Sequence, residues 1–242
     1  MSEANALATL DTTLRYEHES SGAEKMRKGH LEDALIGLDG FEYLMMQYNS
    51  AILEVRTKLE ILNDDLSISE PSNPISYIRS RLKDPLSVYE KLVRQGNEIS
   101  LKSIEQNLTD VAGIRVICPF IDDIYKVANM LVQQDDITLI RTKDYIKRPK
   151  PNGYRSYHMI VEVPVYFANE KKPVRVEVQI RTVAMDFWAN LEHRMKYKRD
   201  LSQKAVDMIY RDLRECADTI NETDEKMMEI RNRINDVLST EE

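Results

Sequence analysis

The segment VRVEVQIR, residues 174–181, constrains the fold more than any other part of this sequence. Apolar and polar residues alternate strictly along it, and such alternation is typical of a β-strand with one buried face and one polar face. The apolar set is Val174, Val176, Val178 and Ile180, and the polar set is Arg175, Glu177, Gln179 and Arg181. We therefore expect this strand to lie in a sheet with its valines in a core and its charged residues on the opposite face.

The rest of the chain supplies further strands and several helices. β-Branched or alternating runs predict strands at 114–118, 137–145 and 156–163. Apolar residues at steps of three and four predict helices at 41–62, 122–134, 183–197 and 203–238. A further helix is expected over 74–95, after the break EPSNP and closed by Gly96. This order predicts an α+β fold, a mixed sheet flanked by helices.

The chain divides into three expected parts. Residues 1–40 have weak periodicity and are expected to form a flexible or partly helical lead, residues 41–198 the central domain, and residues 199–242 a C-terminal helix. The apolar residues of the last helix follow a 3-4 pattern over about four heptads. Spacing alone is equally compatible with packing on its own domain and with a subunit interface.

Several classes of protein and site are excluded. No apolar run approaches the roughly 18–20 residues that span a bilayer, and the opening residues do not resemble a secretory signal, so a cytoplasmic protein is expected. The two cysteines and four histidines lack metal-ligand spacing. A net charge of −7 argues against a nucleic-acid surface, because such binding requires the neutralisation of many phosphates.

Residues 141–158, RTKDYIKRPKPNGYRSYH, are nevertheless strongly basic, with a single acid, Asp144. A local cationic loop in an acidic protein suits a small polyanion. No glycine-rich phosphate loop is present, so side chains would have to bind the phosphates. Tyr154, which follows a glycine, could stack on a base.

A second basic set consists of Lys83, Ser87, Lys91 and Arg94, which would share one face of the expected helix. Taken alone, such a set is more often a solvated helix face. Asp110 and Glu177 are candidate Mg²⁺ ligands, because Mg²⁺ takes one or two carboxylates plus substrate phosphates. A glutamate on the polar face of a strand is otherwise usually just exposed.

Taken in order, four segments resemble the synthetase domain of the RelA/SpoT family. They are RLK (81–83) with Ser87 and Lys91, TDVAGIRVICPF (109–120), the basic loop, and VEVQIRTVAMDFWANLEH (176–193), within a match over roughly 75–198. No histidine is followed by aspartate, so the family's HD hydrolase motif is absent. The chain therefore resembles a stand-alone small alarmone synthetase, nearest to the RelP-type branch.

The resemblance implies a nucleotidyltransferase-like sheet, a homotetramer, and transfer of the β,γ-pyrophosphate of ATP to the 3′-OH of GTP or GDP. In the implied site Asp110 holds Mg²⁺, and Glu177 assists the metal or accepts the hydroxyl proton, with the base role favoured. The implied ATP-binding residues are Arg81 and Arg115, which sandwich adenine, with Lys83, Ser87, Lys91 and Arg94 on the phosphates. The implied GTP- or GDP-binding residues are Lys143, Lys150, Tyr154, His158, Gln179 and Asp186.

The chain departs from the RelQ-type branch at two positions, and two other functions remain as alternatives to the synthetase. Asp186 stands where that branch has asparagine, and Glu60 where its N-terminal helix carries a lysine that binds alarmone. A catalytically silent module that senses alarmone would also need the basic loop, but not Asp110 and Glu177 together. Nucleotidyl transfer, which attacks the α-phosphorus, is the other alternative.

Overall fold

The computed structural model describes residues 36–69, 73–196 and 203–240, and these form two compact units. The smaller unit takes residues 36–46 and 83–108, and the larger takes the other described residues. Residues 1–35 of the expected lead lie outside the described residues. The expected division of the chain into three parts therefore stays a prediction.

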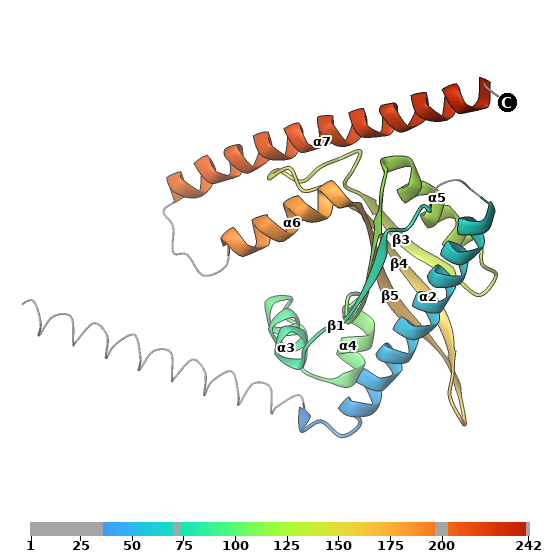
Figure 1. The fold of residues 1–242 in the computed structure, drawn as a ribbon. Coiled ribbons are helices and arrows are strands. Elements are labelled where there is room, and N and C mark those ends of the chain that lie inside the picture. The colour runs from blue at the N-terminus through green and yellow to red at the C-terminus, as the bar shows by residue number, and fades with distance from the viewer. Residues whose placement is uncertain (1–35, 70–72, 197–202, 241–242) are drawn as a thin grey trace, which may run out of the picture. The chain divides into compact units, whose positions relative to one another are not determined.

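A five-stranded sheet forms the centre of the larger unit (Figure 1). Its spatial order is β1-β2-β5-β4-β3, in which β2 and β5 run parallel and the other neighbours run antiparallel. The strands are β1 (Tyr77–Leu82), β2 (Ala112–Cys118), β3 (Thr138–Asp144), β4 (Tyr157–Tyr166) and β5 (Lys171–Thr182). The expected mixed sheet and α+β class are confirmed.

The alternation in β5 has the expected structural result. Val176, Val178 and Ile180 are fully buried, whereas Glu177 and Gln179 on the other face are half-buried. Helix α5 (Ile121–Val132) packs against β5 and β2. Helix α2 (Phe41–Ser69) buries Ala51, Ile52, Val55 and Leu59. The polar face of the sheet is thereby left for the site described below.

The expected helix over 74–95 is wrong in its first half. Residues 77–82 form β1, which pairs along its full length with β2, so the edge of the sheet supplies their backbone hydrogen bonds. Helix α3 (Pro85–Arg94) begins only after Asp84, whose side chain accepts a hydrogen bond from the Ser87 backbone at 2.9 Å. Gly96, with a φ of +70°, follows the end of α3 as expected.

The remaining helices are α4, α6 and α7. Helix α4 (Leu101–Asn107) was not expected and lies in the smaller unit with α3. Helices α6 (Val183–Lys196) and α7 (Gln203–Thr240) pack against each other in the larger unit through a cluster that includes Trp188, Leu213 and Ala217. Among the residues that the structure describes, no helix has the length and apolarity needed to cross a membrane.

Asp123, a buried carboxyl in the first turn of α5, provides a test of the fold. Its side chain accepts a hydrogen bond from the Phe120 backbone at 3.3 Å, and burial together with the charge of Asp122 raises its pKa to about 6. A carboxyl whose pKa is higher in the folded state adds stability below its unfolded pKa, and that stability is lost as the pH rises through about 6.

We therefore expect Asp123→Asn to raise the free energy of unfolding on the order of 1 kcal/mol near neutral pH. The gain should vanish near about pH 4, where the aspartate is protonated in both states. Urea unfolding at the two pH values measures the difference, and an equal effect at both would contradict the assignment.

Candidate active site

Hydrogen-bonded register brings distant polar residues into rows on one face of the sheet. One row crosses all five strands, because Arg115 pairs with both Arg79 and Gln179, and His158 pairs with both Gln179 and Lys143. Residues in register have side chains on the same face. In the next row Arg81 pairs with Gly113, which pairs with Glu177. Six of the predicted site residues therefore share this face: Arg81, Arg115, Lys143, His158, Glu177 and Gln179.

Glu177 is held at both carboxylate oxygens. Oε2 accepts a hydrogen bond from Gln179 Nε2 at 2.9 Å, and Oε1 lies 3.4 Å from His158 Nδ1. Burial alone would raise the pKa of Glu177, but the contacts with His158 and Gln179 outweigh it and lower that pKa. The carboxylate is therefore ionised at neutral pH.

Burial lowers the pKa of His158, against the opposing effect of Glu177, so this histidine is neutral at pH 7. Its Nε2 lies 2.9 Å from the Tyr154 hydroxyl. We assign the proton of the imidazole to Nδ1, because that nitrogen faces the ionised Glu177. Nε2 then accepts a hydrogen bond from the Tyr154 hydroxyl.

Asp144, the single acid of the basic loop 141–158, anchors the start of that loop. Asp144 Oδ1 accepts hydrogen bonds from the backbone nitrogens of Ile146 and Lys147, both at 3.0 Å, and Oδ2 accepts one from the Tyr125 hydroxyl at 3.1 Å. At the far end of the loop, Arg155 donates to the Ala217 carbonyl of α7 at 3.0 Å. The loop is thus fixed at both ends against helices of the larger unit.

A cleft of about 890 Å³ lies beside this loop. Four residues predicted to bind the acceptor nucleotide line it: Lys150, Tyr154, His158 and Gln179. Lys150 Nζ lies 4.6 Å from the centre of the Tyr154 ring, so a cation and an aromatic face lie side by side. Helices α6 and α7 contribute a wall of this cleft that sequence reasoning did not predict, with Glu192, Asp207, Tyr210 and Arg211.

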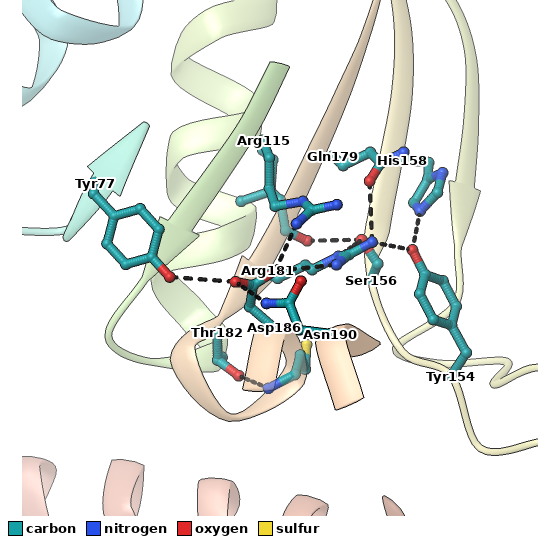
Figure 2. A network of polar contacts seen from close by, with 12 residues as sticks. Tyr77, Arg115, Tyr154, Ser156, His158, Gln179, Arg181, Thr182, Asp186 and Asn190 are labelled. Carbon is teal, nitrogen blue, oxygen red and sulfur yellow. Dashed lines mark hydrogen bonds and ion pairs between the residues drawn. The ribbon is translucent and has the colours of Figure 1, made fainter. Parts of the chain in front are cut away.

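A buried ion-pair network, which sequence reasoning also missed, lies on the same face of the sheet (Figure 2). Its centre is Arg181 with Asp186, whose nearest side-chain atoms are 3.1 Å apart. Asp186, predicted to line the guanosine side, is buried, and its Oδ1 also accepts from Arg115 at 3.1 Å. Burial and the charge of Arg181 lower the pKa of Arg115, while Asp186 opposes that effect.

Four residues predicted to bind ATP phosphates belong to the smaller unit. Lys83 precedes the N-cap of α3, which corrects its expected place on a helix face, whereas Ser87, Lys91 and Arg94 lie on α3 itself. The buried side of that helix consists of Val88 and Leu92. The three predicted residues are half-buried or exposed.

Asp110 stands just before β2, and its charge acts to raise the pKa of Glu177. Two neighbouring carboxylates of this kind fit Mg²⁺, which completes its shell with water and substrate phosphates. Within the described ranges no group of three or more histidine, cysteine or acidic residues could hold a metal by itself. The donor set therefore fits a metal that arrives with a nucleotide.

Comparisons with known proteins show which proteins this chain resembles. The model of the region found in RelA/SpoT proteins matches residues 80–202. The GTP pyrophosphokinase YwaC of Bacillus subtilis is 40% identical over 207 residues, which cover 85% of this chain and 97% of that protein. YjbM, a GTP pyrophosphokinase of the same organism, is 36% identical over 80% of this chain and 90% of its own length.

Solved structures of similar proteins have the same fold as this chain. The small alarmone synthetase 1 of Bacillus subtilis bound to its product pppGpp superposes with a TM-score of 0.72 at 34% identity, covering 82% of this chain and all of that one. A GTP pyrophosphokinase family protein of Streptococcus pneumoniae gives 0.73 at 35% identity, covering 83% and 97% respectively. The small alarmone synthetase fold is therefore confirmed.

Proposed function

The chain belongs to the RelA/SpoT family, and from this premise we propose that it is a (p)ppGpp synthetase that transfers the β,γ-pyrophosphate of ATP to the 3′-OH of GTP or GDP. YwaC and YjbM are GTP pyrophosphokinases, and the chain covers 97% and 90% of their lengths. The observation that carries the mechanism is the position of Glu177. It lies on the sheet between a row of arginines and the cleft beside Tyr154.

In the proposed reaction Glu177 accepts the proton of the 3′-OH. The 3′ oxygen forms a bond to the β-phosphorus, and the bond from that phosphorus to the oxygen bridging the α-phosphate breaks, so AMP leaves with that oxygen. The hydrogen bonds that keep Glu177 ionised also fix its direction. Positioning and charge stabilisation are what phosphoryl transfer demands of a protein.

We assign the donor side to the arginines and to α3. Arg81 and Arg115 would sandwich the adenine by their planar guanidiniums. Lys83, Ser87, Lys91 and Arg94 would bind the ATP phosphates. Asp110 and Glu177 would hold Mg²⁺, which when bound neutralises phosphate charge and polarises the β-phosphoryl group.

We assign the acceptor, GTP or GDP, to the cleft beside Tyr154. Guanine would stack on Tyr154, and Lys143, Lys150 and His158 would lie near the acceptor phosphates. Gln179, which bonds Glu177, would contact the ribose side. Asp186 would act on the guanosine side.

Finer features complete the proposal. The RelP-type branch is supported by the motifs DYIKRPKPNGYRSYH and AMDFWANLEH. A homotetramer is supported by apolar side chains exposed on α7, among them Met227, Ile230, Ile234 and Val237. Both substrates are cytoplasmic nucleotides, so the proposed location is the cytoplasm.

Incubation with γ-labelled ATP, GTP and Mg²⁺ tests the function. We expect label on the guanosine nucleotide together with release of AMP. Labelled free pyrophosphate would instead indicate nucleotidyl transfer. No turnover, with guanine nucleotide still bound, would indicate a catalytically silent module.

A further inference from the structure

Five side chains on the polar face form a closed ring of polar contacts. Arg181 Nη2 donates to the Tyr154 hydroxyl at 2.6 Å and to Gln179 Oε1 at 3.0 Å. The Tyr154 hydroxyl lies 2.9 Å from His158 Nε2, and His158 Nδ1 lies 3.4 Å from Glu177 Oε1. Gln179 closes the ring on Glu177 Oε2 at 2.9 Å. Figure 2 shows the part of this ring around Arg181.

The directions of the hydrogen bonds follow from the two ends of the ring, because a guanidinium has donors and no acceptor and an ionised carboxylate has acceptors and no donor. The Tyr154 oxygen accepts from Arg181, and its own proton is directed at His158 Nε2, which is unprotonated because the imidazole proton is on Nδ1. His158 then presents its Nδ1 proton to Glu177. The second arm runs through the Gln179 amide. Both arms therefore deliver a donor to the same carboxylate.

Arg181 is itself locked in place. Its side chain is only 5% exposed, its Nε lies 3.4 Å from Ser156 Oγ, and its Nη1 donates to Asp186 Oδ1. Asp186 accepts three more hydrogen bonds, from Arg115, from the Tyr77 hydroxyl at 3.3 Å and from Asn190 at 2.9 Å. Four donors fill the acceptor sites of a carboxylate.

We propose that Arg181, anchored by Asp186, is a positioning residue that orients Tyr154, His158 and Gln179 in the acceptor cleft and, through them, Glu177. Three of these residues line the cleft, so they connect the anchored pair to the bound nucleotide. Asp186 then acts through the arginines and not by contact with guanine, which revises its predicted role. The inference rests on the proposed function for the identity of the acceptor.

A purely structural role makes a different prediction. Removing Arg181 leaves the buried Asp186 with only one of its two arginines and destabilises the protein, whereas removing both partners relieves part of that penalty. If Arg181 served stability alone, nucleotide binding would recover in the double variant together with the stability. If it positions the cleft, stability would recover and acceptor binding would not.

The experiment compares Arg181→Met, Asp186→Asn and the double variant with the wild type. GDP and a non-hydrolysable ATP analogue are titrated by calorimetry, and unfolding is followed in urea. For Arg181→Met we expect GDP binding about tenfold or more weaker, with binding of the ATP analogue changed less than about threefold, because Asp186 still pairs with Arg115. The double variant should regain part of the stability, because Arg115 also loses its contact with Asp186, and keep the weak GDP binding.

Arg175→Met is the matched control, since Arg175 lies on the same face of β5 and its contact with Glu162 is longer, at 3.6 Å, and partly exposed. It should bind both nucleotides as the wild type does. Arg181→Lys covers the case in which the methionine variant fails to fold. Its ammonium keeps the charge beside Asp186 but lacks the planar fork that serves both arms, so GDP binding should again weaken.

Two results would overturn the positioning role. One is normal GDP binding in folded Arg181→Met or Arg181→Lys, and the other is recovery of GDP binding along with stability in the double variant. A wild type that binds GDP but makes no alarmone would defeat the proposed function alone. A wild type that makes alarmone while Arg181→Met binds GDP normally would defeat the positioning role alone.

Discussion

The Glu177→Gln variant is expected to lose turnover by about a thousandfold while it still binds both nucleotides, because general-base catalysis and charge are lost together. Glutamine has nearly the same shape, so the backbone of β5 and the packing beneath it should not change. Its amide nitrogen, however, is a donor and meets either His158 or Gln179, which are donors already. The variant therefore removes both the base and its alignment.

Transfer of label from γ-labelled ATP measures this effect, and calorimetry with GDP measures the retained binding. Glu162→Gln is the control, because Glu162 lies on β4 in register with Arg175, four residues along the strand from His158 of the cleft. Its activity should equal that of the wild type. Near-normal turnover in Glu177→Gln would remove Glu177 from the catalytic role.

The sheet could be predicted because its strands carry their own signal. Alternation in β5 already separates the valines from Glu177 and Gln179, and the structure keeps that separation. Edge strand β1 carries only a weak signal, since Tyr77–Leu82 is short and mostly exposed, and Ser80 interrupts the apolar face of Ile78 and Leu82. This segment forms a strand because it pairs with β2, and local periodicity cannot predict such a tertiary contact.

The site, like the sheet, could be predicted only in part. The family resemblance predicted His158, Gln179 and Glu177 as site residues, and alternation predicted only that Gln179 and Glu177 share a face. They lie together because β4 and β5 pair with His158 opposite Gln179. Arg181 has the same spacing, but nothing in its sequence position indicates that it is buried and bonded to Asp186. Burial of a charge depends on which helix covers the strand, and α6 does so here.

Gly153→Ala is the second variant with a large expected effect, because Gly153 closes the acceptor loop against α7. Its φ is +88°, a conformation that costs an L-residue about 1 kcal/mol. An added Cβ would also lie 2.5 Å from Ala217 Cβ and 3.2 Å from Arg214 Cα, and neither atom belongs to a flexible side chain. We expect a loss of stability of roughly 3 kcal/mol or more, with weaker GDP binding as Tyr154 is displaced.

Gly96→Ala separates the two causes, since Gly96 also has a positive φ, +70°, but no atom lies within 4 Å of an added Cβ. It should lose only about 1 kcal/mol and keep its GDP binding. The double variant Gly153→Ala/Ala217→Gly removes the closest contact and should recover part of the stability, less about 1 kcal/mol for glycine within α7. Urea unfolding and GDP calorimetry measure both quantities. Equal losses of stability in Gly153→Ala and Gly96→Ala would mean that contact with α7 does not fix the loop. Packing of Gly153 against Ala217 would then not explain how Tyr154 is held in the cleft.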